Sequence, residues 1–279
     1  MRTAGGISTE AVYIFHNMVR KLVSQHKPDY LAAIFESEGP TFRDEAFEAY
    51  KANRTETPPD LLDQIPWIRK TLEAMRIPVI EFPKYEADDV IGTLSVQATK
   101  AGLETVIVSS DKDMLQLVNP NVAMLNPMKD DTWYDEAMTE QFMGVKPAQV
   151  ADLLALKGDA VDNIPGAPGI GDKGAVAIIQ QFGSVEAALD RAAEVERKMY
   201  RESLQNNRDR ILLSKQLATI HKEVPIDVDL EALKLASPDP TALRELYGTL
   251  EFHTLLRELG GAPKAESPRE YSQLSEADS

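Results

Sequence analysis

The sequence has no cysteine and no long apolar run, and each absence excludes a class of protein. Zero cysteines among the 279 residues exclude disulfide bonds, thiolate metal sites and cysteine nucleophiles. No apolar run reaches the roughly 18 residues that a membrane-spanning helix needs. The stretch Met1 to Gly6 carries one arginine and no apolar segment, so a signal peptide is not expected. These features fit a cytoplasmic protein without a membrane partner.

Positive charge is also scarce. The chain carries 30 Lys and Arg against 45 Asp and Glu, a formal net charge of −15 at pH 7. Because nucleic-acid binding needs cationic contacts, this balance argues at first sight against a nucleic-acid partner. The hydrophobic content of 43% excludes a wholly disordered chain. A chain of this length buries a sizeable core in one large domain or two ordinary ones.

Short apolar runs alternate with helical patterns over the first half of the chain. The helical patterns cover residues 10–25, 61–75 and 87–101. The strand candidates are Tyr30–Phe35, Pro78–Phe82, Thr105–Ser109 and Val122–Leu125. This alternation predicts an α/β core with a mostly parallel sheet over residues 1–145. Such a sheet forms its sites at the carboxyl ends of its strands.

The strand signals nearly vanish from residue 146 onward. Helical patterns at 147–157, 173–182, 185–193 and 243–259 predict a helical domain over residues 146–259. Residues 260–279 are rich in Gly, Pro, Ser and charge, and we expect a flexible tail or linker there.

Acidic residues gather in three groups. Two groups follow strand candidates, and the third places two carboxylates at i,i+3 spacing on one face of a turn. The groups are Glu86/Asp88/Asp89, Asp111/Asp113 and Asp159/Asp162. Crowded carboxylates repel each other and raise their pKa values unless a cation is present, and Mg²⁺ or Mn²⁺ suits such oxygen ligands. Two such ions about 4 Å apart support in-line phosphodiester hydrolysis.

Each acidic group also has an ordinary structural interpretation. Asp88 or Asp111 is equally suited to cap a helix N-terminus. Asp159 and Asp162 are equally suited to a solvated loop. Competing chemistry has little support, because the four histidines lack metal-ligand spacing, no Ser–His–Asp set stands out and no GxxxxGK(S/T) phosphate loop occurs.

The segment after Asp162 is rich in glycine and proline. Gly169 and Gly171, followed by Lys173 and a helical pattern, predict a helix–hairpin–helix turn. Glycines let backbone N–H groups approach a phosphate, and the helix N-terminus and the lysine add positive charge. Such a turn holds the DNA backbone without reading bases. The alternative is an ordinary Gly-Pro connection.

A further segment, residues 39–54, interleaves cations with aromatic rings. Arg43, Lys51 and Arg54 alternate with Phe42 and Tyr50. Cations neutralise phosphates, and aromatic rings stack on unpaired bases. The alternative, which these residues alone favour, is an amphipathic surface helix with ordinary cations.

Six strings of the sequence together resemble one family. GPTFR, YKANR, YEADDVIGTL, SDKDMLQLV, GDAVDNIPGAPGIGDK and LATIHKEVPIDVDL occur in this order. They are similar to the 5′-nuclease domain at the N-terminus of bacterial DNA polymerase I, a member of the flap endonuclease superfamily, over residues 7–259. The resemblance implies a PIN-like α/β nuclease core with a helical arch, followed by a helical domain that carries the helix–hairpin–helix.

The resemblance also implies an activity, cofactors and partners. Members are metal-dependent 5′-3′ exonucleases and flap endonucleases of DNA replication and repair. The implied substrates are DNA with 5′ flaps, nicks or 5′ ends, and RNA primer–DNA hybrids. The implied cofactors are two Mg²⁺ or Mn²⁺ ions, with K⁺ at the helix–hairpin–helix. The implied assembly is a monomer that works with a polymerase domain or with a polymerase in trans.

Roles carry over to this chain position by position. The residues that match the arch cations engaging the 5′ strand or scissile phosphate are Arg43, Lys51 and Arg54. The residues expected to contact DNA are Phe42, Tyr50, Gly169, Gly171 and Lys173. The expected metal ligands are Glu36, Glu86, Asp88, Asp89, Asp111, Asp113, Asp159 and Asp162.

Two features depart from the family pattern. Members begin with a strand of the type LLLIDG, whose Asp is a metal ligand, and we expect an N-terminally truncated core without that first strand. Members also carry Asp where this chain has Glu36, whose carboxylate lies one methylene further out. Without the first strand, Tyr30–Phe35 is expected to expose an unpaired apolar edge.

Three hypotheses follow from the sequence. The leading one is a metal-dependent 5′-nuclease whose activity is impaired by the absent strand. The second is a catalytically weak or inactive module that binds flap or branched DNA, and the third is a folding-defective fragment. Eight of the 45 acidic residues fall in the expected metal set, so the acidic surplus is itself interpreted as a cation site.

Overall fold

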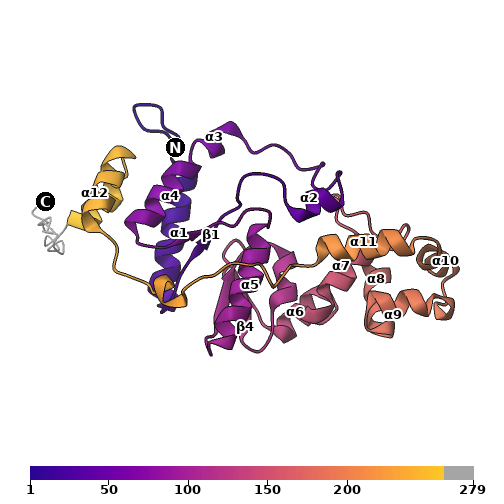
Figure 1. Ribbon diagram of the computed structural model, residues 1–279. Coiled ribbons are helices and arrows are strands. Elements are labelled where there is room, and N and C mark those ends of the chain that lie inside the picture. The colour runs from indigo at the N-terminus through magenta and orange to yellow at the C-terminus, as the bar shows by residue number, and fades with distance from the viewer. Residues whose placement is uncertain (261–279) are drawn as a thin grey trace, which may run out of the picture.

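The structure, a computed structural model, describes residues 1–260 and combines short strands with many helices (Figure 1). The strands are β1 (Ala33–Ile34), β2 (Val79–Ile80), β3 (Thr105–Val108), β4 (Val122–Asn126) and β5 (Thr132–Tyr134). The α-helices up to residue 143 are α1 (Glu10–His26), α2 (Phe42–Ala46), α3 (Pro59–Leu62), α4 (Ile65–Ala74), α5 (Ala87–Lys100) and α6 (Glu136–Met143). From residue 261 on, the predicted tail lies outside the described residues.

The later part of the described chain is helical. Its α-helices are α7 (Val150–Lys157), α8 (Asp172–Phe182), α9 (Val185–Asp190), α10 (Lys198–Asn206), α11 (Arg208–Ala218), α12 (Pro240–Thr249) and α13 (His253–Gly260). The 3₁₀ helices of the chain are η1 (Lys112–Leu117), η2 (Pro147–Gln149), η3 (Ala192–Glu194) and η4 (Leu230–Leu233). Over residues 1–260, no helix has the length and apolar character to cross a bilayer.

The strands form two small sheets. β1 pairs in parallel with β2, and β3 pairs in parallel with β4, which continues antiparallel to β5. The predicted α/β class with parallel strand pairs is confirmed. The predicted single sheet is wrong in detail, because β1 and β3 each pair with one strand only among the described residues. The strands expected at 30–35 and 78–82 accordingly form over two residues each.

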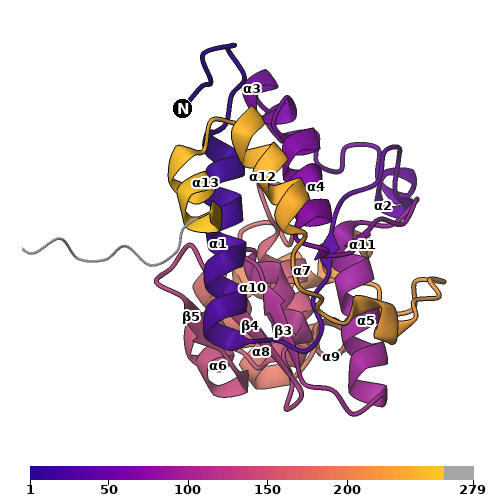
Figure 2. The same ribbon diagram turned by 90° about the vertical axis from the view of Figure 1, so that its left-hand side faces the viewer.

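Two hydrophobic cores hold the chain together. One is built on β3, β4, η1 and the helices α7 to α11, with Leu154 and Ile179 fully buried. The other joins α1, α4, α12 and α13 around Leu72 and Leu250. Figure 2 shows α12 and α13 beside α1 and α4, and Figure 1 shows α12 on the opposite side of the molecule from α7 to α11. The last two helices therefore share a core with α1 and α4, near the start of the chain.

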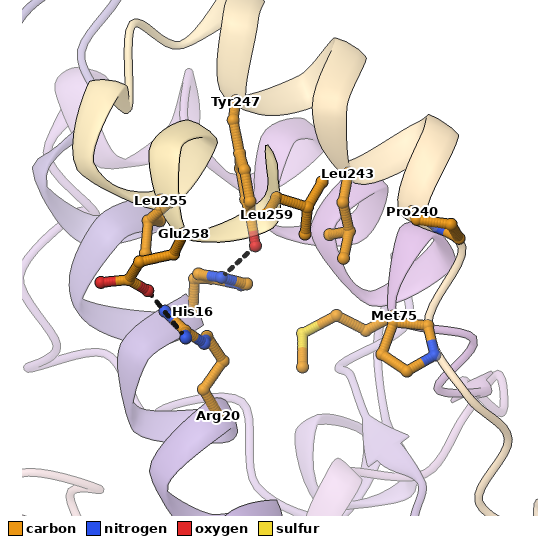
Figure 3. Close-up of a pocket in the computed structure, with 10 residues that line it drawn as sticks. His16, Arg20, Met75, Pro240, Leu243, Tyr247, Leu255, Glu258 and Leu259 are labelled. Carbon is orange, nitrogen blue, oxygen red and sulfur yellow. Dashed lines mark hydrogen bonds and ion pairs between the residues drawn. The ribbon is translucent and has the colours of Figure 1, made fainter. Parts of the chain in front are cut away.

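Polar contacts join α1 to the last two helices at a cavity of about 280 Å³ (Figure 3). The Tyr247 hydroxyl lies 2.7 Å from His16 Nε2, and Arg20 pairs with Glu258 at 2.9 Å. Burial lowers the pKa of His16 to about 4, so the ring is neutral at physiological pH. The two ends of the described chain are thus linked through a neutral His16–Tyr247 pair and an exposed Arg20–Glu258 ion pair.

The segment expected to form a helical arch is mostly irregular. It contains α2 and α3, which span five and four residues, and residues 47–58 between them form neither helix nor strand. Residues 52–63 are all exposed, so a helix there has no apolar surface to cover. Short isolated helices are only marginally stable in water, and this explains why residues 47–58 form no helix.

Candidate metal and nucleic-acid site

Three of the predicted carboxylate ligands follow successive strands and influence one another electrostatically. Glu36 follows β1, Asp88 lies in the first turn of α5 after β2, and Asp111 follows β3. Glu36 Oε2 accepts the N–H of Ala87 at 3.1 Å, which holds the glutamate beside the helix N-terminus. Burial raises the pKa of Asp88 to about 7, with further contributions from the charges of Asp111, Glu86 and Glu36. The structure therefore brings these predicted ligands into one electrostatic neighbourhood.

The donor chemistry of this neighbourhood fits a hard cation. Within residues 1–260, no Lys, Arg or His forms an ion pair with Glu36, Asp88 or Asp111. Asp113 Oδ1 is buried, with Lys112 Nζ at 3.3 Å as its ion-pair partner, and burial raises the pKa of this carboxyl to about 6 against the opposing effect of Lys112. Oxygen donors held in this way are ligands that Mg²⁺ and Mn²⁺ accept. The described side chains nevertheless form no ready-made cluster of three metal-binding groups.

Lys112 forms ion pairs with two other predicted ligands, Asp113 and Asp159. Its Nζ lies 2.8 Å from Asp159 Oδ2 and 3.3 Å from Asp113 Oδ1. Burial is the largest single effect on Asp159 and raises its pKa, but the hydrogen bond and charge of Lys112, together with the backbone N–H groups of Val161 and Asp162, outweigh it and lower the pKa. Sequence reasoning missed this lysine, although its position between Asp111 and Asp113 was a usable signal.

Arg43 and Asp89 form a buried ion pair. Arg43 is 2% exposed and donates to both oxygens of Asp89, at 2.7 and 2.8 Å. Its remaining N–H groups reach the carbonyls of Leu217 and Thr219 at the end of α11. Asp89 also accepts the backbone N–H of His221 at 2.7 Å. Arg43 also lies 3.3 Å from Glu86 Oε2, so both side chains spend their hydrogen bonds inside the protein rather than in the contacts expected for them.

The aromatic residues of the arch segment are less exposed than expected. Tyr50 is 6% exposed, and its hydroxyl donates to Glu86 Oε2 at 3.3 Å, so it offers little free ring surface for stacking. Phe42 is half-buried, with ring centroids of Tyr85 and His221 at 5.7 and 6.0 Å. Tyr50 belongs to the hydrophobic core around β3 and η1, which explains why its ring points inward.

Lys51 and Arg54 connect the arch segment to the carboxylates. Lys51 forms an ion pair with Glu86, whose backbone caps α5. Arg54 Nε donates to Asp162 Oδ1 at 2.8 Å. These two cations therefore lie at the site, as expected, while each one neutralises an acidic residue there.

The predicted hairpin lies between α7 and α8. Gly171 precedes α8, and a Cβ placed on it meets nothing within 4 Å, so its backbone faces open space. Lys173 is exposed in the first turn of that helix. Upstream, a Cβ on Gly166 would lie 2.6 Å from the backbone nitrogen of Gly158. Glycine is therefore required where the two backbone segments cross, and the open hairpin follows directly.

Comparison with known proteins places this fold and site in a family. Residues 1–144 match the family described as "5'-3' exonuclease, N-terminal resolvase-like domain", and residues 145–241 match "5'-3' exonuclease, C-terminal SAM fold". An α/β nuclease core with carboxylates at its strand ends is the class that the architecture defines. The chain belongs to the 5′-3′ exonuclease family, whose members are nucleases.

Relatives of two kinds share this sequence. It is 37% identical to the 5'-3' exonuclease of Aquifex aeolicus over 93% of this chain and 88% of that protein. It is 38% identical to the DNA polymerase I of Bacillus caldotenax over 97% of this chain. It is 42% identical to the DNA polymerase I of Chloroflexus aurantiacus over 90% of this chain. The matches span 31% and 27% of those two polymerases, so the chain corresponds to less than a third of their length.

Solved structures share the fold at low sequence identity. T5 5'-exonuclease with bound divalent metal ions (zinc) has a TM-score of 0.67 at 18% identity, over 91% of this chain and 92% of that chain. The catalytic core of Rad2 in complex with DNA substrate has a TM-score of 0.60 at 18% identity, over 91% and 85%. At these identities the likeness establishes the fold alone.

Proposed function

We propose that the chain is a metal-dependent 5′-3′ exonuclease and 5′-flap endonuclease that hydrolyses DNA phosphodiester bonds. The observation that carries this proposal is the set of three carboxylates, Glu36, Asp88 and Asp111, which follow three strands, influence the pKa of Asp88 and form no ion pair with a cation among the described residues. Family membership and the metal bound by T5 5'-exonuclease support it.

Two groups of carboxylates would hold divalent ions. Glu36, Asp88 and Asp111 would bind one Mg²⁺ or Mn²⁺, and Asp113, Asp159 and Asp162 would contribute to a second. Bound ions of this kind lower the pKa of water and stabilise charge on attacking and leaving oxygens. Asp88 and Asp113 supply buried carboxylates with raised pKa values, whose ionisation a nearby cation favours.

The protein's own cations position the substrate in this proposal. Lys51 and Arg54 would draw a phosphate of the 5′ strand toward the carboxylates, and the Arg43–Asp89 pair would hold α2, α5 and the end of α11 in register beneath them. Gly169, Gly171 and Lys173 would hold the duplex backbone, with K⁺ as the accompanying ion.

The substrates proposed are DNA with 5′ flaps, nicks or 5′ ends, and RNA primer–DNA hybrids. The complex of the Rad2 core with DNA substrate supports a DNA ligand for this fold. The polymerase relatives suggest that a polymerase, in the same chain or in trans, extends the DNA that this nuclease trims. We propose that a monomer carries out the reaction.

A cleavage assay tests the proposal. Duplexes with a labelled 5′ flap and, as a matched control, a labelled 3′ flap are incubated with the protein in Mg²⁺, Mn²⁺ or EDTA. Release of short labelled products from the 5′ flap, in either metal and not in EDTA, is the expected result. Absence of cleavage in both metals, or equal cleavage of the 3′ flap, contradicts the proposal.

A second candidate function is binding of flap or branched DNA with weak or absent cleavage. It is favoured by the ion pairs that occupy the site, because five of the expected ligands pair with Lys or Arg: Glu86, Asp89, Asp113, Asp159 and Asp162. Gel-shift titration with flap DNA in Ca²⁺ or EDTA distinguishes the two functions. Binding without cleavage in Mn²⁺ supports the second, and no binding at moderate salt excludes it.

A further inference from the structure

The arch segment and a carboxylate turn are joined by side-chain amides that the proposed catalytic roles do not use. Asn163 Nδ2 donates to the carbonyl of Ala49 at 2.6 Å. Asn163 Oδ1 accepts from Asn53 Nδ2 at 3.1 Å, and that donor also lies 3.2 Å from the carbonyl of Ala160. One asparagine side chain therefore contacts the arch segment through both its donor and its acceptor.

A backbone hydrogen bond runs beside these amides. The N–H of Lys51 donates to the carbonyl of Asp162 at 2.9 Å. Lys51 and Asn163 have positive φ values of 57° and 56°. Asparagine tolerates this left-handed conformation better than most residues, whereas a lysine there carries a strain of roughly 1 kcal/mol or more. Lys51 is held by its own N–H to the Asp162 carbonyl and by its ion pair with Glu86, and Asn163 adds a hold on the Ala49 carbonyl two residues upstream.

The joined elements carry opposite parts of the proposed site. On the arch side are the cations Lys51 and Arg54, and on the turn side are the carboxylates Asp159 and Asp162. The turn is itself closed by paired backbone hydrogen bonds between Asp159 and Ile164, at 3.0 and 2.8 Å. A rigid turn held to the arch at one residue fixes the distance between substrate-binding cations and metal-binding carboxylates.

We propose that Asn163, with Asn53 as its partner, is a positioning residue that sets the register between the arch cations and the Asp159–Asp162 carboxylates. This inference rests on the proposed nuclease function for its effect on catalysis. The competing explanation is that Asn163 is present only because its left-handed backbone suits asparagine. A glycine at position 163 distinguishes the two explanations, because it adopts the left-handed conformation without strain but has no side-chain amide.

The test compares four variants. Asn163→Gly keeps the permitted backbone and removes both contacts. Asn163→Asp keeps the shape but places a carboxylate oxygen against the Ala49 carbonyl in place of a donor. Asn53→Ala removes the partner alone. Asp130→Gly is the matched control, since Asp130 also has a positive φ of 50° and lies in the β4–β5 turn, outside the proposed site.

Amide hydrogen exchange provides a readout that does not depend on activity. In Asn163→Gly and Asn163→Asp, residues 47–54 should exchange about tenfold faster than in the wild type, because the Lys51 amide loses its support. Asp130→Gly should leave that segment unchanged. Unaltered exchange in both Asn163 variants would show that the Asn163 side chain does not hold residues 47–54 in place. That result overturns the proposal, whether or not the wild type cuts DNA.

Kinetics with flap DNA provide the second readout. Both Asn163 variants should lose about 10- to 100-fold in kcat with little change in KM, because misplaced groups slow the chemical step more than binding. Asn53→Ala combined with Asn163→Gly should cost no more than Asn163→Gly alone, as expected for one shared interaction. A wild type that fails to cut refutes the proposed function instead. An active wild type matched by Asn163→Gly, or a loss confined to KM, overturns the positioning role.

Discussion

Asp88 and Asp113 are acidic side chains held where ionisation is unfavourable. Burial is the main reason that the pKa of Asp88 is raised to about 7, and neighbouring carboxylates add to it. Burial likewise raises the pKa of Asp113 to about 6, against the opposing effect of Lys112. A buried carboxyl of this kind favours its protonated form unless a bound cation stabilises the ionised form. Its protonation state therefore links metal binding and protein stability to pH.

In the metal-free protein, the contribution of Asp88 to stability should be lost as the pH rises. Its folded pKa of about 7 lies above the ordinary value of 3.8, so its stabilising contribution is complete below pH 3.8 and is lost as the pH rises through 7. Between pH 5 and 8 the loss amounts to as much as about 2–3 kcal/mol. Urea unfolding in EDTA should show a flatter pH dependence in Asp88→Asn than in the wild type. The exposed-turn variant Asp130→Asn should match the wild type, and equal slopes in all three proteins would refute the assignment.

The buried Arg43 should matter more to stability than the exposed Arg54. Arg43→Ala leaves the fully buried carboxylate of Asp89 without its guanidinium, which costs about 3–5 kcal/mol. Arg54→Ala removes a pair whose arginine side chain is 46% exposed, at a cost of about 1 kcal/mol or less. Denaturant titration of both variants measures the difference. A stability of Arg43→Ala within 1 kcal/mol of Arg54→Ala would show that the pair is not the support described.

Among the secondary-structure elements, those with a clear hydrophobic periodicity could be predicted from the sequence. The predicted helices at 10–25 and 87–101 and the strands at 105–109 and 122–125 agree with α1, α5, β3 and β4 to within a residue or two at each end. β5, α6, α10 and α11 escaped prediction because they are short or polar. The expected arch helix is absent because its residues have nothing to pack against.

The candidate site was predictable as groups of residues, but its internal pairing was not. The acidic groups could be found because each follows a strand or precedes the glycine hairpin. The pairing of Arg43 with Asp89, and of Lys112 with Asp159, joins residues 46 and 47 positions apart. Such contacts depend on how the elements pack, and no local pattern in the sequence encodes them.

Two glycines of the hairpin should have different effects when substituted: Gly166 should affect stability and Gly171 should affect DNA affinity. Gly166→Ala places a Cβ 2.6 Å from the Gly158 nitrogen at a φ of 59°, so it should cost at least about 2 kcal/mol. Gly171→Ala meets no atom and needs no positive φ, so its unfolding free energy should stay close to that of the wild type. In gel shifts with duplex DNA, Gly171→Ala should nevertheless bind more weakly, since its Cβ occupies the open face. A destabilised Gly171→Ala, or a fully stable Gly166→Ala, would contradict this description of the turn.

At the scale of the whole molecule, the last helices close the structure onto its first helix. α12 and α13 share a core with α1 and α4, and the hydrogen bond of His16 with Tyr247 lies at their centre (Figure 3). The net charge of −15 already counts Arg43, Lys51, Arg54 and Lys112, so their ion pairs with acidic residues at the site leave it unchanged. We therefore expect DNA contact to be confined to local cationic features.

This closure should make the protein sensitive to acid through His16. The folded pKa of about 4 lies below the ordinary 6.5, so the unfolded chain takes up a proton first and stability falls as the pH drops from 6.5 to 4. The full effect is about 3 kcal/mol. The free energy of unfolding of His16→Gln should change less between pH 7 and pH 4.5 than that of the wild type. His26→Gln, at the exposed end of the same helix, serves as the control, and a His16→Gln slope equal to that of the control would exclude this role.

The central claim is that the carboxylates at the strand ends hold the metal that cuts DNA. The most direct test measures Mn²⁺-dependent cleavage of a labelled 5′ flap by the wild type and by Asp111→Asn, together with flap binding in Ca²⁺. We expect the wild type to cleave the flap and Asp111→Asn to cleave it at least about 100-fold more slowly. The variant should bind the flap equally well or more tightly, because a negative charge near the phosphate path is removed. Cleavage by Asp111→Asn at the wild-type rate would contradict the account.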